Sequence, residues 1–584
     1  MISIAIKLKQ LFVGILAVAC TASALPRIAA QADVTDPKFY NTDTLEIFLP
    51  KGSNYIPLDW INNVAYHTAV TTGLYDSNAV EQAFAKMETD GYNVVRIFID
   101  PGDPEHQALG QYGMAGSVST STADLYQPCL DNFIDLLQRA KAHNIRVVVT
   151  LHMWPHNNYY AGIANSNIPA NVENVSIIYL SQNAIDAQTI YHGKLVEAVR
   201  DAEPDGALLP AVFAWELANE VNMLNNIMPF SLTSGTVTPA NGITYDMAVA
   251  VERQQCMDAN VVEWANQCVS AIKAVDSNAL VAASVFTYAA VGKAGPNGLL
   301  PLGVADVRFP ARPSSLLEWS TLDYVDVHTY PTGSGYSISN DLASSEYSIW
   351  NQTKKPLLMG EFGAFKEHYG YNNAQATAAM VAHRDAARNL GFEGELYWMW
   401  QTNGQTRILA MLESGEIVNN ALKPMVLVDA DGDGIDDRPE GIADIDGDGT
   451  PNFHDLDSDG DGAPDFAEFD LGRDPYANVE GELDADGDGD SDLLEMVGGT
   501  DPDLSGDNVG FTVSFALAGS NTDADLSFNF RTGRTYQVWF RTNLVSGVAE
   551  LVDTLDATSD GSYNASEVSA TPEGFYSIDV AWPQ

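Results

Sequence analysis

Basic side chains are scarce in this chain of 584 residues. It has 29 Lys and Arg residues against 78 Asp and Glu residues, which gives a formal net charge of −49. A surface of that sign repels the phosphates that a nucleic-acid-binding protein must neutralise, and it repels anionic lipid headgroups in the same way. We therefore expect no nucleic-acid partner and no binding to anionic membranes.

Long apolar runs are also few, and we expect no membrane span. One run, at residues 11–19, is too short to cross a bilayer. It follows Lys7 and Lys9 and precedes small residues, which is the order of a secretory signal peptide. We assign the signal to residues 1–30, with cleavage after Ala24 or after Ala30. The sequence predicts a secreted protein, destined for the extracellular space, the periplasm or the cell surface.

Cysteine is rare as well, with four residues in the chain. Cys20 lies in the signal, where its lipidation is an alternative to plain secretion. Cys256 and Cys268 are separated by twelve positions in a helical pattern, which would place them about 18 Å apart on one helix. That separation is too large for a disulfide, and we assign neither a disulfide nor a metal to the cysteines.

What the chain does contain predicts a folded protein of several domains. Apolar residues make up 46% of it and charged residues 18%, and a single compact core rarely serves so long a chain. Composition divides it into three zones after the signal. The first covers residues 35–425, the second is an Asp-rich segment at 429–507, and the third covers 508–584.

The first zone predicts an α/β fold, because short apolar runs alternate with amphipathic segments such as the helix expected over 129–143. Eight strands in under 400 residues favour a (β/α)8 TIM barrel, with a doubly wound sheet as the alternative. The expected strands are 52–56, 93–99, 145–152, 211–219, 280–286, 324–330, 356–361 and 394–400.

Polar side chains gather at the carboxyl ends of these strands, which converge on one face of a barrel. Each alone is commonly a loop cap, a salt bridge or a packing residue, but several strands deliver them to the same face. The residues are Arg96, His152, Asn219, Glu220, His328, Tyr330, Glu361 and Trp398.

Two carboxyl groups among them suit the hydrolysis of a glycosidic bond, which needs a protonated acid and an attacking carboxylate. Glu220 and Glu361 are the candidates, expected about 5–5.5 Å apart. Asn219 could bind a sugar 2-hydroxyl. We expect Tyr330 and Arg96 to donate to the attacking carboxylate and to keep its pKa low. The two histidines would line the floor of the pocket, and the indole would stack on a sugar ring.

Four motifs resemble glycoside hydrolase family 5, the cellulase and β-mannanase family of retaining barrel enzymes. They are Trp215-Glu-Leu-Ala-Asn219-Glu220, His328-Thr-Tyr330, Gly360-Glu361-Phe-Gly363 and Tyr397-Trp398-Met-Trp400. The resemblance implies that Glu220 is the acid/base, that Glu361 is the nucleophile, and that the other strand-end residues bind substrate. It also implies a cis peptide bond after Trp398. The chain departs from the family at Val221, where Pro is usual.

The function expected for the first zone is retaining hydrolysis of a β-1,4-linked polysaccharide, as an endo-β-1,4-glucanase or a β-mannanase. No catalytic cofactor is expected. The alternatives are an exo-acting β-mannosidase-type enzyme, and a non-catalytic carbohydrate-binding or calcium-dependent surface protein.

The second zone repeats the ligand spacing of a calcium loop, in which oxygen donors occupy positions 1, 3, 5, 9 and 12 and Gly occupies position 6. A disordered acidic linker would not repeat this spacing of acidic residues four times. The repeats resemble thrombospondin type 3 repeats, which implies structural Ca²⁺ that stiffens a spacer. The ligands are Asp429, Asp431, Asp433, Asp437 and Glu440; Asp444, Asp446, Asp448, Asn452 and Asp455; Asp457, Asp459, Asp461, Asp465 and Glu468; and Asp484, Asp486, Asp488, Asp492 and Glu495.

The third zone alternates apolar and polar residues at period two, with turn-forming residues between the runs. It predicts a small all-β sandwich with strands at 511–515, 526–530, 536–540 and 575–582. A role of this C-terminal region in attachment to a cell surface or matrix is open.

Overall fold

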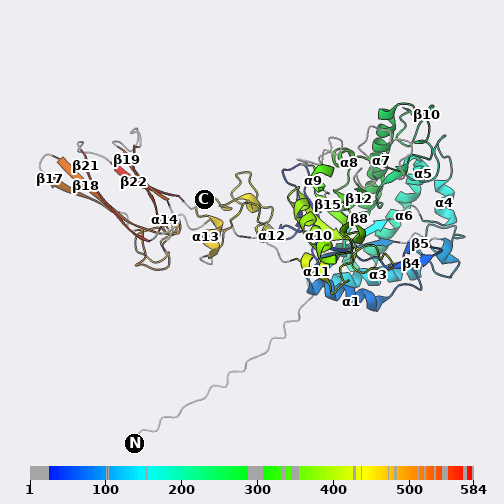
Figure 1. Cartoon of the computed structure of the whole chain (residues 1–584), viewed down its shortest axis with the longest axis horizontal. Helices are drawn as coiled ribbons and strands as arrows, with labels where there is room; N and C mark the ends of the chain where they lie inside the picture. The colour runs from blue at the N-terminus through cyan, green and yellow to red at the C-terminus, as the bar shows by residue number, and fades with distance from the viewer. Residues whose placement is uncertain are drawn as a thin grey trace, which may run out of the picture. The chain divides into compact units, whose positions relative to one another are not determined.

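The computed structural model describes a large part of the chain and divides it into two compact units (Figure 1). Unit 1 comprises Met1–Thr44 and Phe48–Pro424, and unit 2 comprises Leu45–Ile47 and Met425–Gln584. The predicted signal up to residue 24, with Cys20, and the predicted site residue His152 lie outside the described residues. These are 25–99, 102, 104–151, 155–286, 307–331, 337–342, 354–424, 429–433, 435, 437–470, 473–478, 483–498, 500, 502–509, 512–518, 521–531, 535–541, 550–558, 560–569 and 575–581.

Unit 1 contains a closed barrel of eight parallel strands. Each strand pairs with the next along the chain, and β16 pairs with β3 to close the cylinder. The closure confirms the barrel and excludes the doubly wound sheet. The strands are β3 (Lys51–Asn54), β6 (Val94–Ile99), β7 (Arg146–Leu151), β8 (Val212–Glu216), β12 (Val281–Phe286), β14 (Tyr324–His328), β15 (Leu357–Phe362) and β16 (Phe392–Tyr397).

Helices surround these strands (Figure 1). The expected helix at 129–143 is α3, which begins at Gln127 beside a proline and buries Phe133, Leu137 and Ala140 at helical spacing. The helices of unit 1 are α1 (Ser77–Thr89), α2 (Pro104–Gln107), α3 (Gln127–Ala142), α4 (Asn158–Ala164), α5 (Ser176–Leu180), α6 (Gln182–Asp201), α7 (Ala250–Lys273), α8 (Pro313–Trp319), α9 (Ile338–Leu342), α10 (Asn373–Arg388) and α11 (Ile417–Leu422), with short 3-10 turns at Pro204–Gly206, Leu209–Ala211 and Lys366–Tyr369.

Short antiparallel pairs accompany the barrel. Ile28 and Phe39, on the first such pair, are buried against side chains from the early part of the barrel strands. Among the described helices, none is both long enough and apolar enough to cross a membrane. The pairs are β1 (Ile28–Ala30) with β2 (Phe39–Asn41), β4 (Leu58–Ile61) with β5 (Val64–His67), β9 (Asn222–Leu224) with β13 (Arg308–Pro310), and β10 (Thr236–Val237) with β11 (Tyr245–Asp246).

The interior of the barrel is layered from apolar to polar along the strands. Val94, Ala214 and Tyr324 belong to an apolar cluster. Two positions later on the same strands come charged side chains, namely Arg96, Glu216 and Asp326, all fully buried. Side chains two apart share a face of a strand, so the charged layer lies between the apolar cluster and the strand ends.

Gly360 is required by this charged layer. Its N–H donates to Asp326 Oδ1 over 2.6 Å. A Cβ at residue 360 would lie 1.9 Å from Asp326 Oδ2, a distance at which the carboxylate has to move. We expect Gly360→Ala to destabilise the protein by about 2–3 kcal/mol through overpacking, measured as a fall in the thermal unfolding midpoint.

Gly193 provides the matched control for that substitution. It lies within α6, and an added Cβ there would meet no atom within 4 Å. Gly193→Ala is expected to stabilise the protein by up to about 1 kcal/mol, because Ala is the better helix former. Equal unfolding midpoints for Gly360→Ala and wild type would contradict the close packing of Gly360 against Asp326.

Unit 2 begins with the acidic repeats. Short helices start at Asp437, Asp465 and Asp492, the ninth positions of the first, third and fourth loops, and a 3-10 turn starts at Asn452, the ninth position of the second. They are α12 (Asp437–Glu440), the turn Asn452–His454, α13 (Asp465–Asp470) and α14 (Asp492–Gly498).

The C-terminal zone forms two antiparallel sheets of three strands each. A small apolar cluster takes Phe528 from one sheet and Tyr536 from the other, with ring centroids 5.3 Å apart. The packing of the sheets as a sandwich stays a prediction. Four of the strands were expected, and β20 and β21 were not. The sheets are β17 (Thr512–Ala518), β18 (Asn521–Phe530) and β21 (Gly561–Ser569), and β20 (Glu550–Asp556), β19 (Thr535–Arg541) and β22 (Phe575–Ala581).

Candidate functional site

Arg96 is the centre of the candidate active site. Its guanidinium binds both carboxylate oxygens of Glu216, at 2.7 and 2.8 Å. It also donates to Glu361 Oε1 over 2.6 Å and to Asn219 Oδ1 over 2.7 Å. Because the guanidinium is planar and fully buried, these contacts fix the strand ends of β6, β8 and β15 relative to one another.

The two candidate carboxylates meet beside His328. Its Nδ1 lies 3.2 Å from Glu220 Oε1 and 3.4 Å from Glu361 Oε2. Tyr330 donates to Glu361 Oε2 over 2.7 Å. One oxygen of Glu220 and one of Glu361 lie within 4.8 Å of each other. That spacing suits direct attack on the sugar, since inverting enzymes hold their carboxyl groups about 6.5–9.5 Å apart.

The backbone around Glu220 is shaped by the neighbouring strand β12. Glu220 has φ 48°, in the left-handed region. Its N–H donates to Ser284 Oγ over 2.8 Å, and the next N–H, of Val221, donates to the Ser284 carbonyl over 2.8 Å. The chain therefore turns at Glu220, and both backbone donors of the turn are satisfied.

Glu220 also contacts Arg308, a cation that the sequence did not indicate. Arg308, in β13, donates from Nη1 to Glu220 Oε2 over 3.1 Å, and its guanidinium lies over the Phe286 ring, 4.7 Å from the centroid. No motif points to Arg308, because it follows a long connection after β12 and belongs to none of the predicted strands.

The pKa values of the pair run opposite to expectation. Burial raises the pKa of Glu361, and the charge of Glu220 adds to it, against the opposing effects of His328, Arg96 and Tyr330. Burial would also raise the pKa of Glu220, but the hydrogen bond and charge of His328, and then the charge of Arg308, hold it below its usual range. Arg96 and Tyr330 do lower the pKa of Glu361, as expected, but burial outweighs them and the net shift is upward.

His328 carries a positive charge at neutral pH. Burial works against that charge, but Glu361, Asp326 and Glu220 outweigh burial and raise the pKa of His328 to about 10. The site then holds four carboxyl groups and three cations. The carboxyl groups are those of Glu216, Glu220, Asp326 and Glu361, and the cations are Arg96, Arg308 and His328. One carboxyl proton would complete the balance, as an acid paired with a carboxylate requires.

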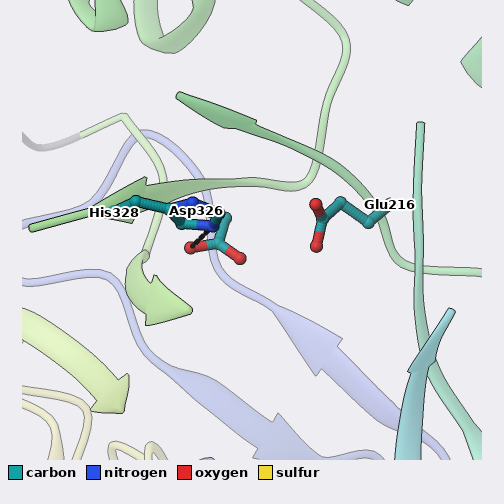
Figure 2. Close-up of side chains that lie close together, drawn as sticks. All are labelled: Glu216, Asp326 and His328. Carbon is teal, nitrogen blue, oxygen red and sulfur yellow. Dashed lines mark ion pairs between the residues drawn. The ribbon is translucent and has the colours of Figure 1, made fainter. Parts of the chain in front are cut away.

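Glu216, Asp326 and His328 form a second buried cluster beneath the pair. Figure 2 shows the Glu216 carboxylate pointing toward Asp326, which lies beside His328; His328 Nε2 and Asp326 Oδ1 are 3.8 Å apart. Three ligand atoms of these residues lie within 4.8 Å of one another, a spacing that could hold a cation. Arg96 binds both Glu216 oxygens, so the chain itself already supplies positive charge here.

Trp398 follows β16 and belongs to an apolar cluster with Phe98, against which Tyr330 packs. Trp398 is 8% exposed, and its Nε1 donates to Gln405 Oε1 over 3.0 Å. The Trp398–Met399 peptide bond is cis, as the resemblance implied. A second indole, that of Trp60 after β3, is 46% exposed and donates to the Asn403 carbonyl over 3.2 Å. The turn at 403–405 thus binds both indoles.

No protein-family model matches this chain. No curated protein sequence matches it either. Among solved structures, it is similar to the β-mannanase of the blue mussel Mytilus edulis, at 15% identity over 69% of this chain and 98% of that chain, with a TM-score of 0.41. It is also similar to the β-1,4-D-mannanase of Cryptopygus antarcticus, at 19% identity over 68% and 95% of the two chains, with a TM-score of 0.41.

A third similar structure is the glycoside hydrolase family 5 mannosidase of Rhizomucor miehei, at 15% identity over 68% of this chain and 97% of that chain, with a TM-score of 0.39.

The acidic repeats form a separate candidate site for cations. Asp429, Asp431 and Asp433 bring one oxygen each within 4.8 Å of the others, and Asp444, Asp446 and Asp448 do the same. A further group joins Asp433 and Glu440 of the first loop to Asp465 of the third.

The loops share one backbone pattern that aims these oxygens inward. In each loop the N–H of the fifth residue donates to the third, as Asp448 donates to Asp446 over 2.9 Å and Asp488 donates to Asp486 over 3.0 Å. The sixth residue needs a positive φ, which Gly supplies at Gly449 (φ 102°) and Gly489 (φ 106°). The described loops therefore share one turn geometry, and their binding of calcium stays a prediction.

The donor set fits a hard divalent cation. Within the described part of the repeats, both carboxylate oxygens of Glu440, Oδ2 of Asp431 and Oδ1 of Asn452 are buried and have no hydrogen-bond partner. Burial and then the charges of Asp431 and Asp433 raise the pKa of Glu440 to about 9. Buried oxygens without donors, crowded by like charges, are the environment that Ca²⁺ stabilises.

Proposed function

We propose that this chain is a retaining β-glycoside hydrolase. The single observation that carries the proposal is the pair Glu220 and Glu361, with oxygens within 4.8 Å, at the carboxyl ends of barrel strands. Each carboxylate has a buried cationic partner, and that partner contacts a further buried carboxylate. One series of side-chain contacts joins Glu361, Arg96 and Glu216, and a second joins Glu220, His328 and Asp326.

The mechanism is a double displacement. With the one carboxyl proton of the site on Glu220, Glu361 attacks the anomeric carbon, the glycosidic bond breaks, and Glu220 donates that proton to the departing oxygen. Glu220 then takes a proton from water, whose oxygen attacks the same carbon and releases Glu361. Asn219, held by Arg96, is placed to bind the sugar 2-hydroxyl. Tyr330 and Arg96 stay on Glu361 and orient the attacking oxygen.

The proposed substrate is a β-1,4-linked glucan or mannan. Support comes from the four motifs of the glycoside hydrolase family 5 resemblance and from two indoles, Trp398 and the exposed Trp60, that can stack on pyranose rings. The alternative functions are exo-acting mannosidase activity and non-catalytic carbohydrate binding. Exo action releases monosaccharide alone, and a binding protein retains a polymer without cutting it.

The test is release of reducing ends from cellulose, mixed-linkage glucan, mannan, xylan and chitosan. We expect one β-1,4-glucan or mannan to be cut, with the first product having the anomeric configuration of the substrate in a proton NMR time course. Inverted product would contradict double displacement. Retention of a polymer on an affinity gel with no cutting would favour the binding protein.

We further propose that the chain is secreted and that its repeats bind structural Ca²⁺. Of the two cleavage positions, the one after Ala24 leaves Ile28 and the rest of β1 in the mature protein, where Ile28 is buried. The bound ion would supply positive charge between carboxylates that otherwise repel one another. Attachment to a surface through the C-terminal region stays a proposal without direct support.

A further inference from the structure

Trp60 is an exposed indole that the fold holds in place. Nearly half of the residue is exposed, yet its Nε1 donates to the Asn403 carbonyl over 3.2 Å. A Cβ added at Gly404 would lie 2.5 Å from the same nitrogen, so the indole lies directly on the backbone of this turn. A single exposed apolar side chain needs no explanation by itself. An indole fixed in this way offers a preformed apolar surface to a ligand.

The ribbon of β4 and β5 directs Trp60 to the end of the barrel that carries the site. Leu58 and Trp60 are two positions apart, so their side chains share one face of β4. Leu58 packs against the apolar cluster that contains Trp398 and Phe98. His67, opposite Leu58 on β5, stacks on Phe98 with ring centroids 4.0 Å apart. Trp60 therefore lies on the face of the ribbon that packs on the strand ends.

The opposite face of the ribbon is also anchored. Asp59 and Tyr66 are directly opposite each other, and both lie against His106 of α2. Asp59 Oδ2 is 3.6 Å from His106 Nε2, and the rings of Tyr66 and His106 have centroids 4.9 Å apart. The ribbon is therefore held on both faces, and Trp60 keeps its place without a ligand.

The two indoles Trp60 and Trp398 lie across the barrel from Glu220. In the closed order of strands, three strands separate β8 from β16 in either direction. Glu220 follows β8, whereas Trp398 follows β16 and Trp60 follows β3, the next strand around the barrel. The acid has to reach the departing sugar, so that sugar lies on the Glu220 side. The sugar retained on Glu361, and the chain attached to it, therefore extend toward the indoles.

We propose that Trp60 binds a sugar of the retained chain, at least one unit beyond the sugar that Glu361 attacks. The inference rests on the proposed function. Trp398 is bound by the same turn, through Gln405 over 3.0 Å, and its cluster packs against Tyr330, which donates to Glu361. Trp398 therefore suits the attacked sugar, and Trp60, the more exposed indole, suits a sugar farther from Glu361. A site for a second retained sugar favours cleavage within a polymer over release of single terminal sugars.

The experiment uses the full chain with Trp60→Ala and Trp60→Phe. Rates of phenol release are measured on nitrophenyl β-glycosides that carry one, two or three β-1,4-linked sugars, in a mannose series and a glucose series. The phenol is the leaving group in every compound, so only the number of retained sugars changes within a series.

In the wild type we expect kcat/KM to be about tenfold higher for the longer glycosides of one series than for its one-sugar glycoside. Trp60→Ala should lower kcat/KM on the longer glycosides by about the same factor. It should leave the one-sugar glycoside unchanged, because only the longer compounds reach the indole. Trp60→Phe should lose less, since it keeps an aromatic face.

Trp319→Ala is the matched control, since Trp319 is also an exposed indole but lies on helix α8. It should change no rate. Equal rates for Trp60→Ala and wild type, or an equal loss on short and long glycosides, would overturn the inference while an active wild type keeps the proposed function. A wild type that prefers one-sugar glycosides would also overturn it. A wild type that cuts neither series and no polysaccharide would overturn both proposals. Trp60→Phe, with the same selective loss expected, decides the matter if Trp60→Ala does not fold.

Discussion

Replacing Glu361 by Gln should lower kcat on the accepted polysaccharide by about 10⁴-fold. The amide cannot attack the anomeric carbon, so no glycosyl-enzyme forms. The measurement is the steady-state rate of reducing-end release, with intact-protein mass spectrometry to detect the covalent intermediate. Arg96 can donate to the amide oxygen, and the Tyr330 hydroxyl can accept from the amide NH2, so the fold should survive the change.

Replacing Glu220 by Gln should have a different signature. With a sugar leaving group, kcat should fall by about 10²- to 10³-fold, because the proton donor is gone. With a dinitrophenyl glycoside, which leaves without a proton, one equivalent of phenol should appear in a burst before the slow second step. A burst from Glu361→Gln instead would reverse the two roles.

Glu395→Gln is the matched control for both substitutions. Glu395 is also a buried glutamate on a barrel strand, β16, and it pairs with an arginine, Arg388. Its partner lies on helix α10, away from the pair described above. We expect the kcat of Glu395→Gln to equal that of the wild type. If its kcat fell as far as that of Glu361→Gln, the loss of activity in both variants would be attributed to folding.

Removing calcium should unfold the segment at 429–507. At free Ca²⁺ a hundredfold above the dissociation constant, each site adds about 2.7 kcal/mol to the stability of the folded segment. Without the ion, buried carboxylates such as those of Glu440 and Asp431 repel one another. The measurement is limited proteolysis of the full chain with and without EDTA, with cleavage sites read by mass spectrometry.

Two controls separate calcium from other effects of the chelator. Restoring Ca²⁺ should restore protection, whereas Mg²⁺ at the same concentration should not, because Mg²⁺ resists the many-oxygen coordination of such loops. The barrel should keep its kcat in EDTA, since the proposed chemistry uses Glu220 and Glu361 alone. Equal proteolysis rates with and without EDTA would contradict a structural role for the ion.

The barrel could be predicted because its signal is local. Each strand is a short apolar run, and all eight predicted strands begin and end within three residues of the observed ones. The acidic repeats could be recognised for the same reason, because their spacing is a property of contiguous sequence, but their binding of calcium stays a prediction. Two strands of the C-terminal zone, β20 and β21, were missed because polar residues interrupt their alternation.

The contacts between distant residues could not be predicted in the same way. Asp326 lies two positions before the strand-end residue His328, and Glu216 lies two positions after the buried Ala214, so the strand period could have indicated that both point into the barrel. Arg308 gave no such signal. Its contact with Glu220 joins residues 88 positions apart, and it is one of the charges that reverse the expected pKa order of the pair.

The two halves of the proposed site differ in what anchors them. Glu361 and its partner Arg96 both belong to barrel strands, whereas Glu220 and Arg308 lie after a strand and on a short ribbon. Exchanging the segments that follow β8 and β12 for those of another barrel would therefore change the surroundings of Glu220 and leave Glu361 and Arg96 in place. For engineering, β9 and β13 are the segments to vary around Glu220, and the charged layer inside the barrel is the part to keep.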